Sequence, residues 1–142
     1  IFGEEEKATE WIDTYLAKAK EVGASIKETY GEESSYLSFL ASGGSLFIFD
    51  GAGLGTIFYD DMGLAKPEGM PQQENVSLPV AIATDEDLAA LTASSIWNGT
   101  EAVKNGNVVT LPASPYFNQG YSPIGRLVFV EEVEALLEGM HE

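Results

Sequence analysis

A long amphipathic pattern over residues 4–29 constrains the fold of this chain most strongly. Apolar side chains recur there at helical spacing, with Glu and Lys between them, at Ala8, Trp11, Ile12, Tyr15, Leu16, Ala19, Val22 and Ile26. The cluster Gly31-Glu32-Glu33-Ser34 ends the pattern. We therefore predict a long amphipathic helix over residues 4–29.

The segment after this helix predicts a β-hairpin and then a short helix. The apolar runs Tyr36–Ala41 and Leu46–Phe49 flank the turn Ser42-Gly43-Gly44-Ser45. A glycine-rich loop over residues 51–55 leads into the predicted short helix, Thr56–Met62, which is followed by another glycine.

In the second half of the chain, short apolar runs alternate with helical patterns. Pro79–Ala83 and Val108–Leu111 are predicted strands. Thr84 stands at the N-cap of a helix that ends near Ala93, because acidic residues follow it in the first turn.

The last predicted helix starts at Ser122-Pro123, a cap followed by proline, and stops at Gly139. Its inward-facing residues are expected to be Ile124, Leu127, Val128, Val133, Leu136 and Leu137. Helices alternating with short strands predict an α/β fold, a three-layer α/β/α sandwich with a central, mostly parallel sheet and a long N-terminal helix. Residues 1–142 are expected to form a single domain.

The charge of the chain excludes several classes of partner. It carries 23 acidic and 7 basic residues, for a net charge of −16, so nucleic-acid phosphates and anionic lipids would repel it. Solubility is the simplest reason for such a surface. Its hydrophobic content of 44% argues against a disordered chain. It has no cysteine, which excludes disulfides, thiolate catalysis and cysteine metal sites.

The chain opens with Ile1-Phe2-Gly3 rather than methionine, and no cationic signal segment precedes Glu4. We therefore expect a processed or excised piece whose targeting signal lay upstream. No run of apolar residues approaches the roughly 20 needed to span a bilayer.

Three features suggest chemistry, but each lacks a required part. Gly51-Ala52-Gly53-Leu54-Gly55 has neither the spacing of a dinucleotide fingerprint nor the lysine of a phosphate loop. His141 is the sole histidine and lies beside the chain end, where it cannot be held rigidly against a nucleophile. The clusters Asp60-Asp61 and Asp85-Glu86-Asp87 fit neither a catalytic carboxylate pair nor a calcium loop. We expect no catalytic residue, no metal site and no cofactor.

The loop before the last helix is the best candidate for ligand contact. It carries three aromatic residues, Tyr116, Phe117 and Tyr121, together with the amides Asn118 and Gln119. Such a set can line an apolar pocket and orient a ligand within it. The alternative is that one or two of the rings pack beneath the loop.

Four segments share their order and spacing with one known family. Residues 96–109, Ile-Trp-Asn-Gly-Thr-Glu-Ala-Val-Lys-Asn-Gly-Asn-Val-Val, match a W-x-x-L-x-A-V-K-N-G-R-V stretch. Gly53–Leu64 matches a glycine loop and short helix ending in Leu-Gly-Leu, Gly3–Ala8 matches G-K-E-E-K-A, and Pro123-Ile124-Gly125 matches G-P-I-A. In these features the chain resembles the iron–siderophore and cobalamin solute-binding proteins of ABC importers.

This resemblance implies the C-terminal lobe of a bilobed receptor, with residues 4–29 as the helix between the lobes. The receptor would lie outside the cytoplasmic membrane, in the periplasm or lipid-anchored. It would bind a ferric siderophore or similar chelate without chemistry and dock onto a permease. A missing N-terminal lobe would complete the cleft, and the protein is expected to be a monomer. The implied ligand-binding residues are Ser38, Phe39, Gly53, Leu54, Tyr116, Phe117, Asn118, Tyr121 and Arg126.

The sequence departs from the family pattern in two places, and these departures bear on the expected ligand and on docking to the permease. Relatives that bind anionic siderophores often carry arginine near the end of the first strand, but Leu37–Ser42 has none, and Arg126 is the only arginine in the chain. A neutral or hydroxamate-like ligand fits better, or the other lobe pairs the charge. The family's helix and docking glutamate before Pro79 are also missing.

Several alternatives stay open at this point. The ligand could be cobalamin or haem rather than a siderophore. The chain could also be an acidic structural or interaction domain. A small carboxylate-based hydrolase would need two facing acids, which the sequence does not show.

Overall fold

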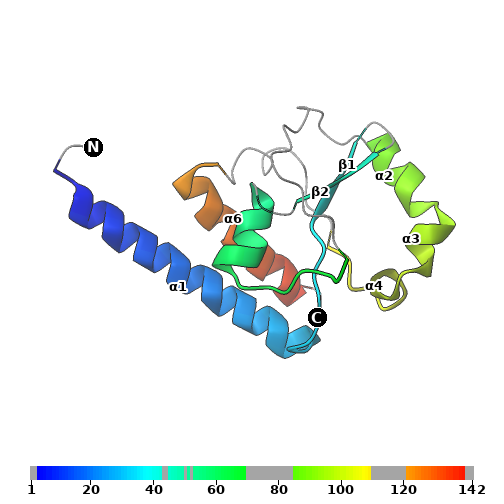
Figure 1. The fold of residues 1–142 in the computed structure, drawn as a ribbon, viewed down its shortest axis with the longest axis horizontal. Helices are drawn as coiled ribbons and strands as arrows, with labels where there is room; N and C mark the ends of the chain where they lie inside the picture. Colours follow the sequence, from blue (N-terminus) through cyan, green and yellow to red (C-terminus); the bar gives the residue numbers. More distant parts are fainter. Residues whose placement is uncertain are drawn as a thin grey trace.

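The computed structural model of the chain describes residues 3–42, 45–49, 51, 53–69, 85–109 and 121–139, and most of these are helical. The helices are α1 (Glu5–Tyr30), the π-helix η1 (Thr56–Asp61), α2 (Asp85–Thr92), α3 (Ser95–Gly99), α4 (Glu101–Lys104) and α6 (Pro123–Gly139). The strands β1 (Phe39–Ser42) and β2 (Ser45–Ile48) form an antiparallel pair. Figure 1 shows α1 running along one side of the molecule, with α6 and η1 packed beside it.

Helix α1 confirms the helix predicted over residues 4–29. Glu5 and Glu6 stand in its first turn, where negative charge favours the helix dipole. The helix ends at Gly31, whose φ of 103° few other residues tolerate, and whose N–H donates to the Lys27 carbonyl at 2.8 Å. The predicted stop at the Gly31 cluster is therefore confirmed.

The core lies where α1, η1 and α6 meet. Its buried residues are Tyr15, Ala19, Val22, Ile26, Ile57, Met62, Leu64, Phe129, Val130 and Val133. The rings of Phe58 and Phe129 meet edge to face, with centroids 5.4 Å apart, and join η1 to α6. Packing between helices thus buries most of the apolar surface in the described residues.

Helix α1 lies very close to the residue that follows η1. A Cβ built on Gly23 would lie 2.0 Å from the Met62 carbonyl oxygen, so only glycine fits there. On the α6 side, Lys18 donates to Glu134 at 2.8 Å, an ion pair whose side chains are about a third exposed. Close backbone approach and apolar packing therefore hold α1 in place, with this ion pair at the edge.

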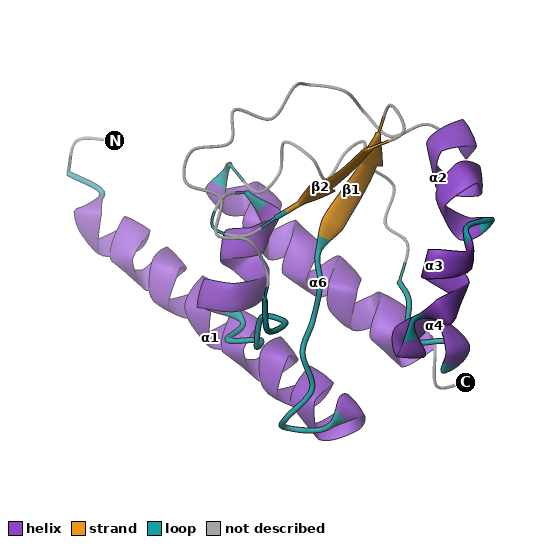
Figure 2. Ribbon diagram, turned by 45° about the vertical axis from the view of Figure 1, so that its right-hand side comes forward, coloured by secondary structure: helices purple, strands orange, loops and turns teal. Residues whose placement is uncertain are grey.

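The hairpin confirms the strand pair predicted around Ser42–Ser45. Phe39 pairs with Ile48 and Ser42 with Ser45 in an antiparallel register. Figures 1 and 2 show this hairpin between the α1, η1 and α6 helices and the run α2 to α4, with α2 against β1. The predicted short helix Thr56–Met62 is also present, as a π-helix in which the Met62 N–H donates to the Ile57 carbonyl at 2.9 Å.

The predicted three-layer α/β/α sandwich with a central parallel sheet is wrong. In the described ranges the sheet consists of β1 and β2 alone, apart from one parallel bridge between Ser35 and Ala65. Val108 and Val109 lie outside any strand, and the predicted strand Pro79–Ala83 falls outside the described residues. The physical reason is that α1 buries its apolar face on η1 and α6 rather than on a sheet.

Helix α6 begins and ends where the sequence predicts, but its inward face is different. Ser122 caps it by accepting a hydrogen bond from the Gly125 N–H at 3.1 Å. Ile124, predicted to point inward, is 73% exposed, whereas Phe129 and Val130 are buried. Of the other predicted inward residues, Val133 is buried and Leu127 packs partly buried against the core, while the side chain of Leu137 falls outside those described.

Candidate functional site

A shallow, open hollow of about 330 Å³ lies between the first half of α1, the end of η1 and the start of α6. It is lined by Trp11, Ile12, Tyr15, Leu16, Asp61, Tyr121, Ser122, Pro123 and Arg126. Two residues of the predicted binding set, Tyr121 and Arg126, are therefore in one hollow. The rest of the lining comes from α1, from Asp61 of η1, and from Ser122 and Pro123 at the start of α6.

The α1 wall of the hollow is aromatic because of the helical repeat. Trp11 and Tyr15 stand one turn apart on α1, and their rings stack with centroids 5.6 Å apart and an interplanar angle of 2°. Ile12, on the same wall, is 49% exposed. The fully buried residues of α1 thus begin at Tyr15, whereas Trp11 is partly buried against the core and Ile12 is about half exposed.

Asp61, the last residue of η1, supplies the polar floor. Its Oδ2 accepts a hydrogen bond from the Tyr15 hydroxyl at 2.5 Å and another from Arg126 Nη1 at 2.9 Å. The Asp61 side chain is only 13% exposed. One carboxylate oxygen of Asp61 therefore joins α1, η1 and α6. Both hydrogen bonds are stronger than bonds between neutral groups, because the acceptor is charged.

Tyr15 is kept protonated by this arrangement. Burial raises the pKa of its hydroxyl well above the ordinary value, and the hydrogen bond to Asp61 and the negative charge of Asp61 raise it further. The nearby charge of Arg126 opposes part of this effect. Tyr15 is therefore a hydrogen-bond donor at any physiological pH, not an acid or base for catalysis.

Gly53, a third predicted residue, lies beside the hollow. Its φ is 55°, and a Cβ built on it would come 3.2 Å from the Tyr121 hydroxyl oxygen. The Tyr121 ring is nonetheless 63% exposed. Because residue 53 has no side chain, the loop before η1 can approach this ring. Gly53 therefore lies close to Tyr121, which lines the hollow together with Arg126.

The remaining predicted residues do not line the hollow. The Ser38 N–H donates to the Tyr59 hydroxyl at 3.3 Å, and the Phe39 ring meets Trp97 edge to face at 5.7 Å. Leu54 packs against the core. Tyr116, Phe117 and Asn118 fall outside the described residues, so their predicted role stays a prediction.

Sequence reasoning missed Trp11, Ile12, Tyr15 and Asp61 as site residues. The sequence predicts the first three on a buried helix face, and it gives Asp61 no catalytic role because adjacent helical positions such as Asp60 and Asp61 point away from each other. The available signal was Arg126, the single arginine of the chain, which needs an acidic partner when half-buried.

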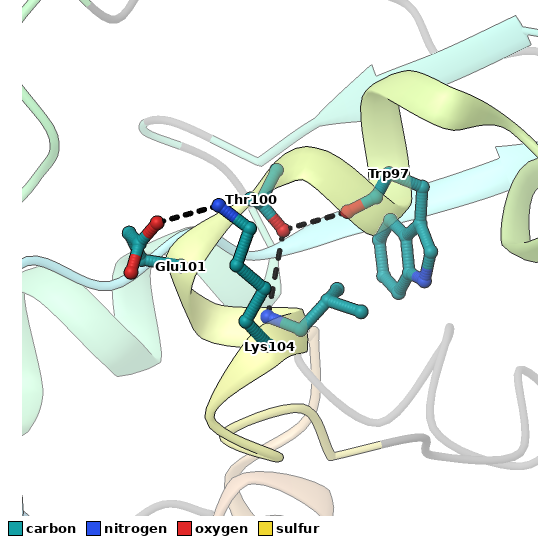
Figure 3. A network of polar contacts seen from close by, with 5 residues as sticks. Trp97, Thr100, Glu101 and Lys104 are labelled. Atoms are coloured by element: carbon teal, nitrogen blue, oxygen red, sulfur yellow. Dashed lines mark hydrogen bonds and ion pairs between the residues drawn. The ribbon is translucent and has the colours of Figure 1, made fainter.

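A polar network at the start of α4 has a structural role. Figure 3 shows Thr100 donating to the Trp97 carbonyl at 2.8 Å and accepting from the Val103 N–H, while Lys104 pairs with Glu101 at 2.7 Å. These bonds cap α4 and join it to α3. They satisfy backbone hydrogen-bonding groups, so helix capping accounts for this network and no ligand is needed to explain it.

The described residues show neither a metal-binding cluster nor a membrane-spanning helix. They contain no group of three or more His, Asp or Glu side chains placed to hold a metal ion. No helix there is both long and apolar enough to cross a bilayer.

Comparisons with protein-family models, curated proteins and solved structures found no match to this chain. The resemblance to solute-binding proteins therefore remains a proposal.

Proposed function

We propose that this chain binds a bulky organic ligand, a ferric siderophore or similar chelate, in the hollow between α1, η1 and α6, and does no chemistry on it. One observation carries the proposal: Tyr121 and Arg126 line one hollow with the stacked rings of Trp11 and Tyr15, and Arg126 pairs there with Asp61. Aromatic walls with a few orienting polar groups are typical of ligand sites.

The size of the hollow supports a shared site. At about 330 Å³ it is near the small end of the range for ligand pockets, and it is open to solvent. A second lobe closing over it would bury more of the ligand and raise the affinity. The proposal therefore includes the missing N-terminal lobe, docking onto an ABC permease, a monomeric receptor and a position outside the cytoplasmic membrane.

The helical fold changes what supports this proposal. The family resemblance implied a sheet-based lobe, and the described core is built from helices instead. Support for ligand binding comes from the hollow itself, whereas the importer context comes from sequence resemblance alone. A binding assay can test the first part without assuming the second.

A second candidate function is an acidic interaction domain. Glu5, Glu6, Glu10 and Asp13 gather on one exposed face of α1, beside Thr9 and Thr14. A basic protein surface would complement them. A carboxylate hydrolase has less support, because Asp61 is the single acid among the described lining residues of the hollow between α1, η1 and α6 and is held by Tyr15 and Arg126.

The two tryptophans of the chain allow a direct test. Trp11 lines the hollow, and Trp97 lies on α3 against Phe39. We expect a bound ferric chelate to quench Trp11 fluorescence in the full-length protein. Quenching should persist in Trp97→Phe and be largely lost in Trp11→Phe, with ferrichrome, ferric enterobactin and cobalamin as probes and free tryptophan correcting for absorption.

The pair of variants also locates the site. Equal quenching in both variants would place the ligand elsewhere in the protein. No saturable quenching of the wild-type protein by any probe would end the siderophore proposal and favour the interaction domain.

A further inference from the structure

The hollow contains one positive and one negative side chain, and they neutralise each other. Among the described residues lining it, only Asp61 and Arg126 are charged, and their Oδ2 and Nη1 atoms are 2.9 Å apart. The site thus offers a ligand hydrogen-bonding groups and aromatic surface, but no net charge.

Asp61 cannot easily move away from this position. Tyr15 and Arg126 both donate to Oδ2, and the side chain is mostly buried. Turning it outward would leave a buried hydroxyl and a half-buried guanidinium without this partner, which is costly. An anionic ligand approaching Arg126 would therefore meet a fixed negative charge a few ångströms away, and like charges at that range repel strongly in a partly buried site.

The surroundings of the hollow act in the same direction. The first half of α1, which forms one wall, carries Glu5, Glu6, Glu10 and Asp13 on its exposed side. The whole chain has a net charge of −16. The electric fields of these four acidic residues and of the whole chain both repel anions, although salt screens them beyond roughly 10 Å.

We propose that Asp61 is a specificity-determining residue: by cancelling the charge of Arg126 it makes the hollow select uncharged metal chelates and reject anionic ones. This inference rests on the proposed function, because it concerns the same hollow and the same class of ligand. The selectivity would thus depend on one carboxylate, that of Asp61, which does not itself attract the ligand.

Two substitutions of opposite sign test it. Asp61→Asn keeps the shape and can still accept from Tyr15, but removes the negative charge that lies 2.9 Å from Arg126 Nη1. Arg126→Gln leaves the charge of Asp61 uncompensated. Dissociation constants for ferrichrome, an uncharged ferric trihydroxamate, and ferric enterobactin, an anionic tris-catecholate, would be measured by fluorescence in the full-length protein at low and physiological salt. Thermal unfolding would show that each variant is folded.

The expected result is a change in the ratio of the two dissociation constants. Wild type should prefer ferrichrome, Asp61→Asn should shift the ratio toward ferric enterobactin by roughly tenfold, and Arg126→Gln should shift it away. Equal losses for both probes would show a purely structural role and overturn the inference while leaving ligand binding intact. A wild-type preference for the anion would also overturn it. Absence of binding for both probes would overturn this inference together with the proposed function.

Discussion

Asp61 accepts hydrogen bonds from side chains that lie 46 and 65 positions away in the sequence. No local pattern marks such a group, because its partners are a tyrosine and an arginine on two different helices. A search for paired carboxylates or metal ligands passes over it. The candidate site could therefore be predicted only in part: Gly53, Tyr121 and Arg126 were expected, and the residues that join them were not.

Tyr15→Phe tests the Asp61 cluster through pH. Because the folded-state pKa of Tyr15 is raised, the unfolded chain loses this proton first, at about pH 10, and stability must fall as pH rises further. Below pH 10 the full stabilisation is present. Near neutral pH the variant should lose about 1–2 kcal/mol of unfolding free energy, and above pH 10 its deficit should shrink.

Urea unfolding at several pH values would measure this difference. Tyr121→Phe is the matched control, because its ring is mostly exposed and its loss should change stability little. Parallel pH profiles for wild type and Tyr15→Phe would contradict the assignment.

At the scale of elements, the long helices and the hairpin were predictable, whereas the short helices α3 and α4 were not, and the predicted central parallel sheet was wrong. Helices α1 and α6 carry their own signals: the cap at Ser122, the stop at Gly31 and a repeated apolar spacing. A short apolar run such as Val108–Leu111 has no such signal, because periodicity does not separate a buried strand from a segment packed on helices. The wrong fold class came from treating such runs as paired strands.

The contact of α1 with the end of η1 yields a sharp prediction. Gly23→Ala would place a methyl group 2.0 Å from the Met62 carbonyl oxygen, so the two segments must separate. We expect a loss of about 3 kcal/mol of unfolding free energy, which outweighs the gain of roughly 1 kcal/mol in helix propensity.

Gly139→Ala supplies the comparison. A Cβ there meets nothing within 4 Å, and the residue also lies in a helix. Its stability in urea should be unchanged or slightly higher. If both variants behaved alike, the close approach at Gly23 would not exist in solution.

For the whole molecule, charge repulsion should be measurable. The 23 acidic and 7 basic residues repel one another more than they attract, and exposed ion pairs such as Lys7–Glu4 contribute less than about 1 kcal/mol each. Raising NaCl from about 0.01 to 0.15 M, which shortens the screening length from roughly 30 to 8 Å, should therefore increase the urea midpoint. A midpoint that falls with salt would show that ion pairs outweigh repulsion.

The uneven burial of α1 has a mechanical consequence. All of its buried residues lie at Tyr15 or later, and its first turns extend past the rest of the molecule in Figure 1. At that end Trp11 packs partly buried against the core and stacks on Tyr15, whereas residues 4–10 and 12–14 are exposed. Segments with few buried contacts bend and open at low free energy. The exposed turns before Trp11 can therefore move without disturbing Val22, Ile26 and the residues packed on them.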